Sequence, residues 1–128
     1  MQNSMMKVLV VDDDQDLVQF LSTALLEKGW QVQTAHNAEE AYHSSQHDRP
    51  DVIVLDIHMP AGGGKTALKR LRTSHVSFDI PVLLMSSDAD TAMSPEMREL
   101  RPDGFIRKPL EAERLHLALK RLVEGKMA

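Results

Sequence analysis

The sequence contains no cysteine, which excludes disulfide bonds and thiolate metal sites from its 128 residues. It also has no apolar run as long as a membrane span or a signal-peptide core. Positive charge is not in excess, because the formal net charge is -4, and this argues against direct binding to nucleic acid. The 42% of hydrophobic and 27% of charged residues are typical of one soluble domain, which we expect in the cytoplasm.

A stretch in the middle of the chain carries the first chemical signal. Val52 to Leu55 form a continuous, β-branched apolar run, which is typical of a central parallel strand covered by helices on both faces. Asp56 follows where this strand ends. Ligands of open parallel α/β sheets bind outside the carboxyl ends of the strands, so Asp56 is a candidate site residue. The alternative is a turn-favouring aspartate that merely follows a strand.

Three other predicted strands also end in polar residues. The apolar run at 7–11 ends in Asp12 and Asp13, the run at 81–85 ends at Ser86, and the weaker run at 104–107 is followed by Lys108. A further strand is expected at 31–34, where polar and apolar residues alternate as they do at a sheet edge. The repeated layout of strand and polar residue indicates a shared site more strongly than any single instance.

Helical patterns separate these strands. The first follows the acids Asp14 and Asp16 and ends before Gly29. Four more helices are expected: from Asn37 to about Gln46, after a loop at Gly62–Gly64, from Ser94 to about Leu100, and from Ala112 to Val123.

Five strands alternating with five helices predict an α/β fold with a doubly wound, flavodoxin-like parallel sheet in the strand order 2-1-3-4-5. Residues 6–125 form the domain in this interpretation, with a flexible N-terminus at 1–5 and a C-terminal tail at 126–128. The strand order brings five polar residues around one crevice: Asp12, Asp13, Asp56, Ser86 and Lys108.

Three carboxylates in one crevice repel one another unless a proton, a cationic side chain or a divalent metal offsets them. Oxygen ligands favour magnesium, which takes one or two carboxylates and completes its shell with water or phosphate. Lys108 adds a positive charge, and a carboxylate can act as a nucleophile toward a phosphoryl group. The residues therefore predict a magnesium-dependent site for phosphoryl groups.

With these motifs the chain resembles the receiver domain of two-component response regulators, from Lys7 to Val123. The resemblance implies Asp56 as phospho-acceptor, Asp12 and Asp13 as the acid pair, and Ser86 and Lys108 as the residues that contact the phosphoryl group. It implies a metal site of Asp13, Asp56 and the backbone carbonyl of His58, and a switch formed by Ser86 and Phe105. It also implies a cis Lys108-Pro109 bond, which the sharp turn into the last helix favours as well.

The function implied by the resemblance is phosphoryl transfer from a histidine kinase or a histidine phosphotransfer protein onto Asp56, with magnesium as cofactor. The domain would be a phosphoprotein and not a turnover enzyme, with at most slow self-phosphorylation and autodephosphorylation. Its fourth helix, fifth strand and fifth helix would form the face that switches toward an output domain or target protein. No contact with nucleic acid or membrane is expected. Whether the domain stands alone or belongs to a longer regulator is left open.

Three residues depart from the family pattern. Gly63 stands where many relatives carry an acid, which we expect to change the stiffness of the loop before the third helix. Ser87 follows Ser86 where a smaller residue is common, so self-dephosphorylation is expected to be unusual. Phe105 lacks a hydroxyl, so a switch there would rest on packing, and a purely structural place in the core is its alternative.

Several other functions compete with this interpretation. The segment Gly62–Thr66 resembles the end of a phosphate-binding P-loop, but Met59 replaces the first glycine and Pro60 removes a backbone N–H. A flavin module is disfavoured by the crowded acids and by an aromatic content of 4%. A metal-dependent phosphatase usually has an acid where His58 stands.

Two structural alternatives concern charged and metal-binding residues. His43 and His47 are one helical turn apart and could bind zinc, but the sequence offers no evident third ligand and a surface position is favoured. The acid pair and Lys108 could form an ion-pair network without function, although their convergence from separate strands argues against it.

Overall fold

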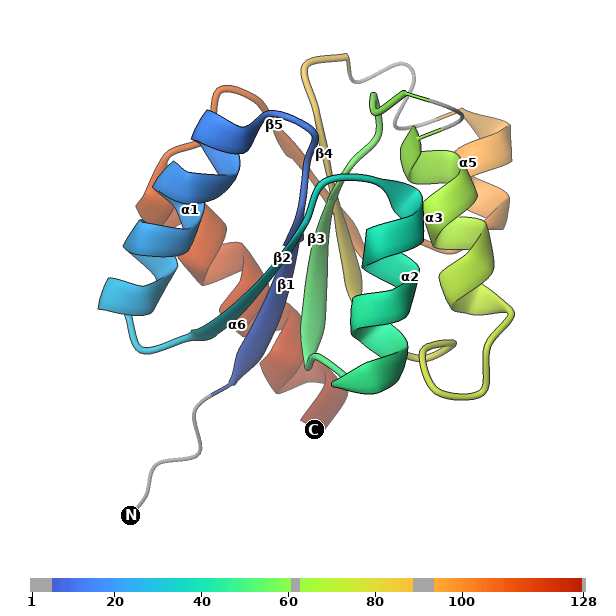
Figure 1. Cartoon of the computed structure of the whole chain (residues 1–128), viewed down its shortest axis with the longest axis horizontal. Coiled ribbons are helices and arrows are strands. Elements are labelled where there is room, and N and C mark those ends of the chain that lie inside the picture. Colours follow the sequence, from blue (N-terminus) through green and yellow to red (C-terminus); the bar gives the residue numbers. More distant parts are fainter. Residues whose placement is uncertain (1–5, 61–62, 89–93, 128) are drawn as a thin grey trace.

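The computed structural model describes residues 6–60, 63–88 and 94–127, in which strands and helices alternate as predicted (Figure 1). The strands are β1 (Lys7–Val11), β2 (Gln31–Ala35), β3 (Val52–Asp56), β4 (Val82–Ser86) and β5 (Gly104–Arg107). The helices are α1 (Gln15–Glu27), α2 (Ala38–His47), α3 (Gly63–Arg72), α5 (Pro95–Glu99) and α6 (Ala112–Met127). The predicted flexible terminus at 1–5 lies outside the described residues. Helix α6 continues to Met127, so the boundary at residue 125 stays a prediction.

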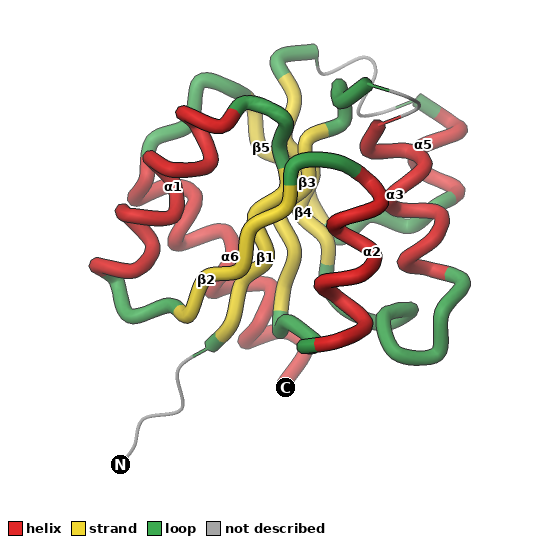
Figure 2. Tube along the Cα trace, in the orientation of Figure 1, coloured by secondary structure: helices red, strands yellow, loops and turns green. Residues whose placement is uncertain are grey.

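The strands form one parallel sheet in the order β2-β1-β3-β4-β5, which confirms the predicted topology. The registers place Val11 of β1 beside Leu55 of β3, and Ser86 of β4 beside Arg107 of β5. The carboxyl ends of these strands therefore meet at one edge of the sheet, at the top of the view in Figure 2. This edge is called the carboxyl edge below, and the opposite one the amino edge.

Helices cover both faces of the sheet, α1 and α6 on one side and α2, α3 and α5 on the other (Figure 1). Strands β3 and β4 are buried at every residue, as their continuous apolar runs predict. Alternate residues of a strand enter separate cores: Leu9 and Ile53 pack with α2 and α3, whereas Val10 and Val54 pack with α1 and α6. None of the helices in the described part of the chain combines the length and hydropathy that a membrane crossing requires.

Local capping explains where three helices begin. The side chains of Asp14 and Asn37 accept hydrogen bonds from backbone N–H groups in the first turns of α1 and α2, at 3.1 and 2.8 Å. Ser94 does the same for α5, where Pro95 occupies the first helical position. Helix α1 ends before Gly29, whose φ of 97° is accessible to glycine without strain. The predicted caps at Asn37, Ser94 and Gly29 are confirmed, and Asp14, predicted only as an acid near the start of its helix, is the N-cap of α1.

The prediction of a loop at Gly62–Gly64 is wrong for its last two residues, because α3 begins at Gly63. A run of glycines favours a loop through its backbone entropy, but tertiary packing overrides this preference. A Cβ on Gly64 would lie 2.5 Å from the carbonyl oxygen of Asp56 and 2.6 Å from the Cα of Ile57. The absence of a side chain thus lets the first turn of α3 lie directly against the end of β3.

Candidate functional site

Three acids gather at the carboxyl edge, as the sequence predicts. Asp12 follows β1 and Asp56 ends β3, and they are only 1% and 3% exposed, whereas Asp13 is exposed to solvent. One carboxylate oxygen of each lies within 4.8 Å of the others. Because β1 and β3 are paired neighbours, the residues after Val11 and Leu55 emerge side by side. The cluster therefore combines two buried acids with one that solvent can reach.

Asp12 is held in place from three directions. Its backbone N–H donates to the carbonyl of Ala35 at 3.1 Å, which extends the pairing of β1 with β2. One carboxylate oxygen accepts from the N–H of Asp14 at 3.0 Å, and the other accepts from Lys108 Nζ at 2.9 Å. These contacts fix the direction of a buried carboxylate and give it a counter-charge.

Lys108 reaches the acids from the end of β5. Its N–H donates to the carbonyl of Ser86 at 2.9 Å, and its peptide bond to Pro109 is cis, as predicted. Its ammonium group lies 3.5 Å from Asp56 Oδ1, in addition to its hydrogen bond with Asp12. Burial alone would lower the pKa of Lys108, but the hydrogen bonds and charges of Asp12 and Asp56 outweigh it and raise that pKa. Lys108 therefore stays protonated over the neutral pH range.

The negative charge of the Asp56 carboxylate is only partly compensated by its surroundings. Burial is the largest cause that raises the pKa of Asp56 above its ordinary value of 3.8, and the nearby charge of Asp12 adds to it. The N–H of His58, 3.3 Å from Asp56 Oδ1, and the ammonium of Lys108 lower that pKa without cancelling the rise. Asp56 is thus a buried acid whose ionised form lacks sufficient positive charge nearby.

The donor set of this cluster fits a hard divalent cation such as magnesium. Its side-chain ligands are carboxylate oxygens, and the exposed Asp13 leaves an access path from solvent. The His58 N–H bonds to Asp56, so the backbone of His58 lies beside the cluster as the predicted carbonyl ligand requires. A cation here would supply the positive charge that Lys108 alone does not.

Ser86 lies at the same edge, but its hydroxyl is engaged away from the acids. The residue is fully buried, and its Oγ lies 2.8 Å from the N–H of Asp88, 3.0 Å from the carbonyl of Asp88 and 3.0 Å from Nε2 of His58. The side chain of His58 was not predicted to take part in the site. The pairing of β3 with β4 is the signal in the sequence that brings these residues near each other.

Phe105 is half buried, and it packs against the hydrophobic core under α2 and α3. It lies beside Leu84 in the pairing of β4 with β5. This packing fits both the structural alternative and the predicted switch, which stays a prediction.

The structure gives no support to the nucleotide-binding alternative. The N–H groups of Gly63 and Gly64 donate to the carbonyls of Pro60 and Ile57, at 3.2 and 3.1 Å, so they are not directed at a ligand. Lys65 forms an ion pair with Glu96 instead of reaching toward a phosphate.

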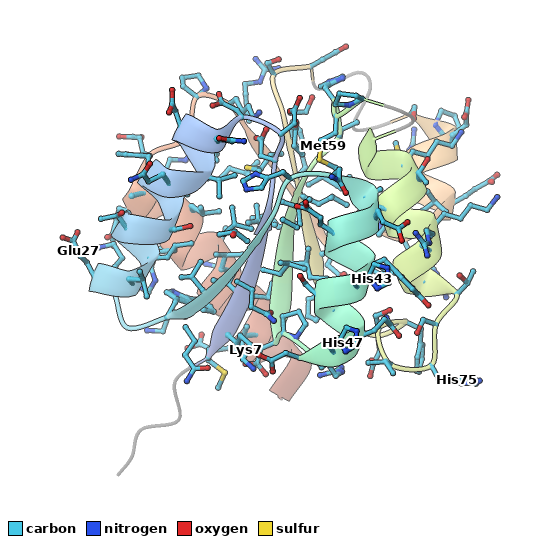
Figure 3. The ribbon with its side chains drawn as sticks, in the orientation of Figure 1. Lys7, Glu27, His43, His47, Met59 and His75 are labelled. Atoms are coloured by element: carbon cyan, nitrogen blue, oxygen red, sulfur yellow. The ribbon has the colours of Figure 1, made fainter. Side chains whose placement is uncertain are left out.

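The histidine pair of α2 lies on the surface, as favoured by the sequence (Figure 3). His43 bonds to Glu39 at 2.8 Å, and the rings of His43 and His47 stack with their centroids 6.2 Å apart. In the described part of the chain, the group of three metal-ligating side chains that lie close together is the acid cluster at the carboxyl edge.

Comparison with known proteins places this geometry in a family. The family model described as the response regulator receiver domain matches residues 8–120. Transcriptional regulatory protein PrrA of Mycobacterium tuberculosis is 35% identical over 117 residues, which are 91% of this chain and 49% of that protein. Regulatory protein AtoC of Escherichia coli is 30% identical over 118 residues, which are 92% of this chain and 25% of that protein. The chain thus spans half or less of the length of these two relatives.

A solved structure of similar length also belongs to a response regulator. The chemotaxis response regulator CheY4 of Vibrio cholerae superposes with a TM-score of 0.86 at 31% sequence identity. The match covers 93% of this chain and 99% of that one. The acid cluster therefore lies on a fold that this response regulator shares over 93% of the chain.

Proposed function

The chain belongs to the family of response regulator receiver domains, and from this premise we propose that Asp56 accepts a phosphoryl group from a histidine kinase or a histidine phosphotransfer protein. Receiver domains of two-component systems are phosphorylated on an aspartate, bind magnesium in an acidic pocket and act as phospho-acceptors rather than turnover enzymes. The proposal assigns these family properties to individual residues of this chain.

The observation that carries the proposal is the unequal environment of the acids. Asp12 is directly bonded to Lys108, whereas Asp56 lies farther from the ammonium group and has a raised pKa. A carboxylate that is buried, constrained and incompletely neutralised is suited to become an acyl phosphate, because the negative charge then moves from the carboxylate to the phosphoryl oxygens. We therefore assign Asp56 as the nucleophile and Asp12 as the anchor of Lys108.

The reaction exchanges one bond to phosphorus for another. A carboxylate oxygen of Asp56 attacks the phosphorus, the bond from phosphorus to the donor imidazole breaks, and the imidazole leaves with the electron pair. Lys108 stabilises the negative charge on the transferred oxygens, and Ser86 donates a hydrogen bond to one of them. Magnesium, held by Asp13, Asp56 and the carbonyl of His58, would neutralise charge shared between the acids and the phosphoryl group.

The proposed signal leaves through the face built from α5, β5 and α6. Ser86 connects the site to this face because β4 pairs with β5, and Lys108 N–H bonds to the carbonyl of Ser86. Phe105 on β5 would occupy space released when Ser86 turns toward the phosphoryl group. An output domain or a target protein in the cytoplasm would recognise the changed face, and neither nucleic acid nor membrane would touch this domain directly.

Phosphorylation with a small donor tests the assignment without knowledge of the partner kinase. Acetyl phosphate with magnesium should add one phosphoryl group to the wild type, measured by intact mass, and removal of magnesium should abolish the addition. Asp56→Asn should not be modified. Asp16→Asn is the matched control, since it removes one exposed carboxylate from α1 and should be modified like the wild type.

Two results would contradict the assignment. One is modification of Asp56→Asn to the wild-type extent, which would place the acceptor elsewhere. The other is rapid release of phosphate over many turnovers that continues in Asp56→Asn, which would favour the phosphatase alternative with a different nucleophile.

A further inference from the structure

The hydroxyl of Ser86 lies within hydrogen-bonding distance of three partners. A serine hydroxyl carries one hydrogen to donate and two lone pairs to accept. The Asp88 N–H occupies one lone pair at 2.8 Å, and two further partners, the Asp88 carbonyl and His58 Nε2, each lie at 3.0 Å. When Nε2 of His58 carries a hydrogen, these partners match the three positions that the buried hydroxyl offers.

Both possible arrangements of the hydrogens leave the serine hydrogen engaged. If Nε2 of His58 carries a hydrogen, it donates to Ser86 and the serine hydrogen goes to the Asp88 carbonyl. If Nε2 carries none, the serine hydrogen goes to His58 instead. In either arrangement, Ser86 can donate to a phosphoryl oxygen only after a bond present in this structure is broken.

His58 contacts both Asp56 and Ser86. Its backbone N–H donates to Asp56 Oδ1 at 3.3 Å, while its ring crosses from the end of β3 to Ser86 at the end of β4. The residue is exposed overall, so packing does not require an imidazole at this position. Among residues 6–60, 63–88 and 94–127, the hydrogen bond found for the ring is the one to Ser86.

We propose that the imidazole of His58 is a positioning residue that holds the Ser86 hydroxyl in its resting orientation and so opposes its turn toward the phosphoryl group. This inference rests on the proposed function of Asp56. It concerns the side chain of His58, whereas the expected metal ligand is the backbone carbonyl of the same residue. The hydrogen bond to the ring would stabilise the resting orientation of Ser86, so part of the free energy of binding a phosphoryl group would be used to break it.

Loss of the ring should therefore strengthen binding of a phosphoryl mimic. One hydrogen bond between uncharged groups contributes enough to change an equilibrium about threefold to tenfold. We expect His58→Ala to bind beryllofluoride, in the presence of magnesium, more tightly than the wild type by about that factor. Fluorine NMR at one fixed pH measures the bound fraction directly.

A double-mutant cycle isolates the hydroxyl. In a Ser86→Ala background the ring has no hydroxyl to hold, so adding His58→Ala should leave the affinity for beryllofluoride unchanged. The nitrogen chemical shift of His58 Nε2 should move in Ser86→Ala, because its bonding partner is lost. Beryllofluoride affinities are compared at a magnesium concentration that saturates each protein, so that any change in magnesium binding does not enter the comparison. His75→Ala removes an exposed ring far from the site and should match the wild type throughout (Figure 3).

The outcomes separate this inference from the proposed function. If the wild type binds beryllofluoride, Asp56→Asn does not, and His58→Ala binds as the wild type does, the inference fails and the phospho-acceptor assignment stands. Tightening by His58→Ala that persists in the Ser86→Ala background also overturns the inference, because the ring then acts by widening access. If the wild type does not bind beryllofluoride, the proposed function fails together with the inference.

Discussion

Each edge of the sheet has a partly or fully buried cation among oxygen atoms, Arg72 at the amino edge and Lys108 at the carboxyl edge, but the two differ in how completely their charges are compensated. At the amino edge, Arg72 is 8% exposed in its side chain and donates to five oxygens at 2.8 to 3.2 Å. These oxygens are the carbonyls of Phe78, Ile80, Leu100 and Arg101 and a carboxylate oxygen of Asp103. Arg72 thereby ties the end of α3 to the segments that precede β4 and β5.

At the carboxyl edge, Lys108 is 25% exposed in its side chain and contacts two of three clustered carboxylates. The pKa of Asp56 is raised there, chiefly by burial and then by the charge of Asp12. A buried ion with every bond satisfied stabilises the fold, whereas a buried cluster of like charges has a cost that function must explain. The two edges therefore differ in how completely their buried charges are compensated, and the carboxyl edge, where compensation is incomplete, is the one with the proposed function.

Surface shape alone would mislead about these edges. A hollow of about 250 Å³ lies at the amino edge, lined by Arg72, Phe78, Asp79, Arg101 and Asp103. Its arginine and aspartate at positions 72 and 103 already bond to each other at 2.9 Å. Charged residues in a hollow therefore indicate a site only when their charges and bonds are incomplete.

The largest expected effect comes from breaking the amino edge. Arg72→Ala should lower the free energy of unfolding by about 3–5 kcal/mol, because four carbonyls lose their side-chain donor and the carboxylate of Asp103 loses its cation while it keeps the N–H of Val82. Urea unfolding followed by circular dichroism measures this change. Arg70→Ala is the matched control on the same helix, since Arg70 pairs with the exposed Glu39 and stacks on Tyr42, and it should cost about 1 kcal/mol or less. Equal urea midpoints for the two variants would refute the structural role of Arg72.

The next effect concerns the metal at the carboxyl edge. Asp13→Asn should weaken magnesium binding roughly tenfold, because a carboxylate that solvent can reach is lost from a site with few protein ligands. Asp14→Asn is the control: it removes the same charge one residue later and retains a good helix cap. Calorimetric titration compares the two variants. Unchanged magnesium affinity in Asp13→Asn would remove Asp13 from the metal site.

A smaller effect should appear in the pH dependence of stability. The raised pKa of Asp56 means that the folded protein binds this proton more tightly than the unfolded chain does. As pH rises above about 3.8, ionisation of Asp56 therefore costs stability until the folded carboxyl has titrated. Asp56→Asn lacks this cost, so it should be more stable than the wild type by about 1 kcal/mol at neutral pH, with the gain fading toward pH 3.

Unfolding midpoints at several pH values test this difference. The lowered pKa values of Glu39, Glu96 and Glu113 affect both proteins alike and cancel in the comparison. If the stability difference between the two proteins stays constant with pH, or grows as the pH falls, the pKa of Asp56 is not raised in the folded protein.

The sequence was sufficient to predict the sheet, its order and the convergence of the acids with Lys108. These features follow from local patterns, because apolar runs mark buried strands and parallel strands end at a common edge. The cis bond before Pro109 was also predicted, from the family resemblance and from the turn it must make. The assignments of Asp56, Asp13 and Ser86 to steps of the reaction stay predictions.

The remaining features depend on side-chain directions, which sequence spacing does not contain. Arg72 resembles any other basic residue on a polar helix, and nothing near it in the sequence indicates its bonds to residues near the starts of β4 and β5, such as Phe78 and Asp103. The ring of His58 turns toward Ser86, a choice between rotamers that goes with its hydrogen bond to a residue 28 positions away. The start of α3 at Gly63 depends on the close approach of Gly64 to the backbone of Asp56, which only the folded structure shows.

The smallest expected effect tests whether the carboxyl edge transmits its change while the amino edge stays fixed. Beryllofluoride at Asp56 should draw the Ser86 hydroxyl inward, and Ser86→Ala removes one hydrogen bond from that state, which changes a two-state ratio about fivefold. Amide exchange in α5, β5 and α6 should therefore respond less to beryllofluoride in Ser86→Ala than in the wild type.

Ser87→Ala, which removes an exposed hydroxyl from the next residue, should respond like the wild type. Amides at 101–103, beside Arg72, should not respond in any of the three proteins. An identical response of the α5, β5 and α6 face with and without the Ser86 hydroxyl would leave Phe105 as a residue of the core, because no other part of the proposed switch acts on it.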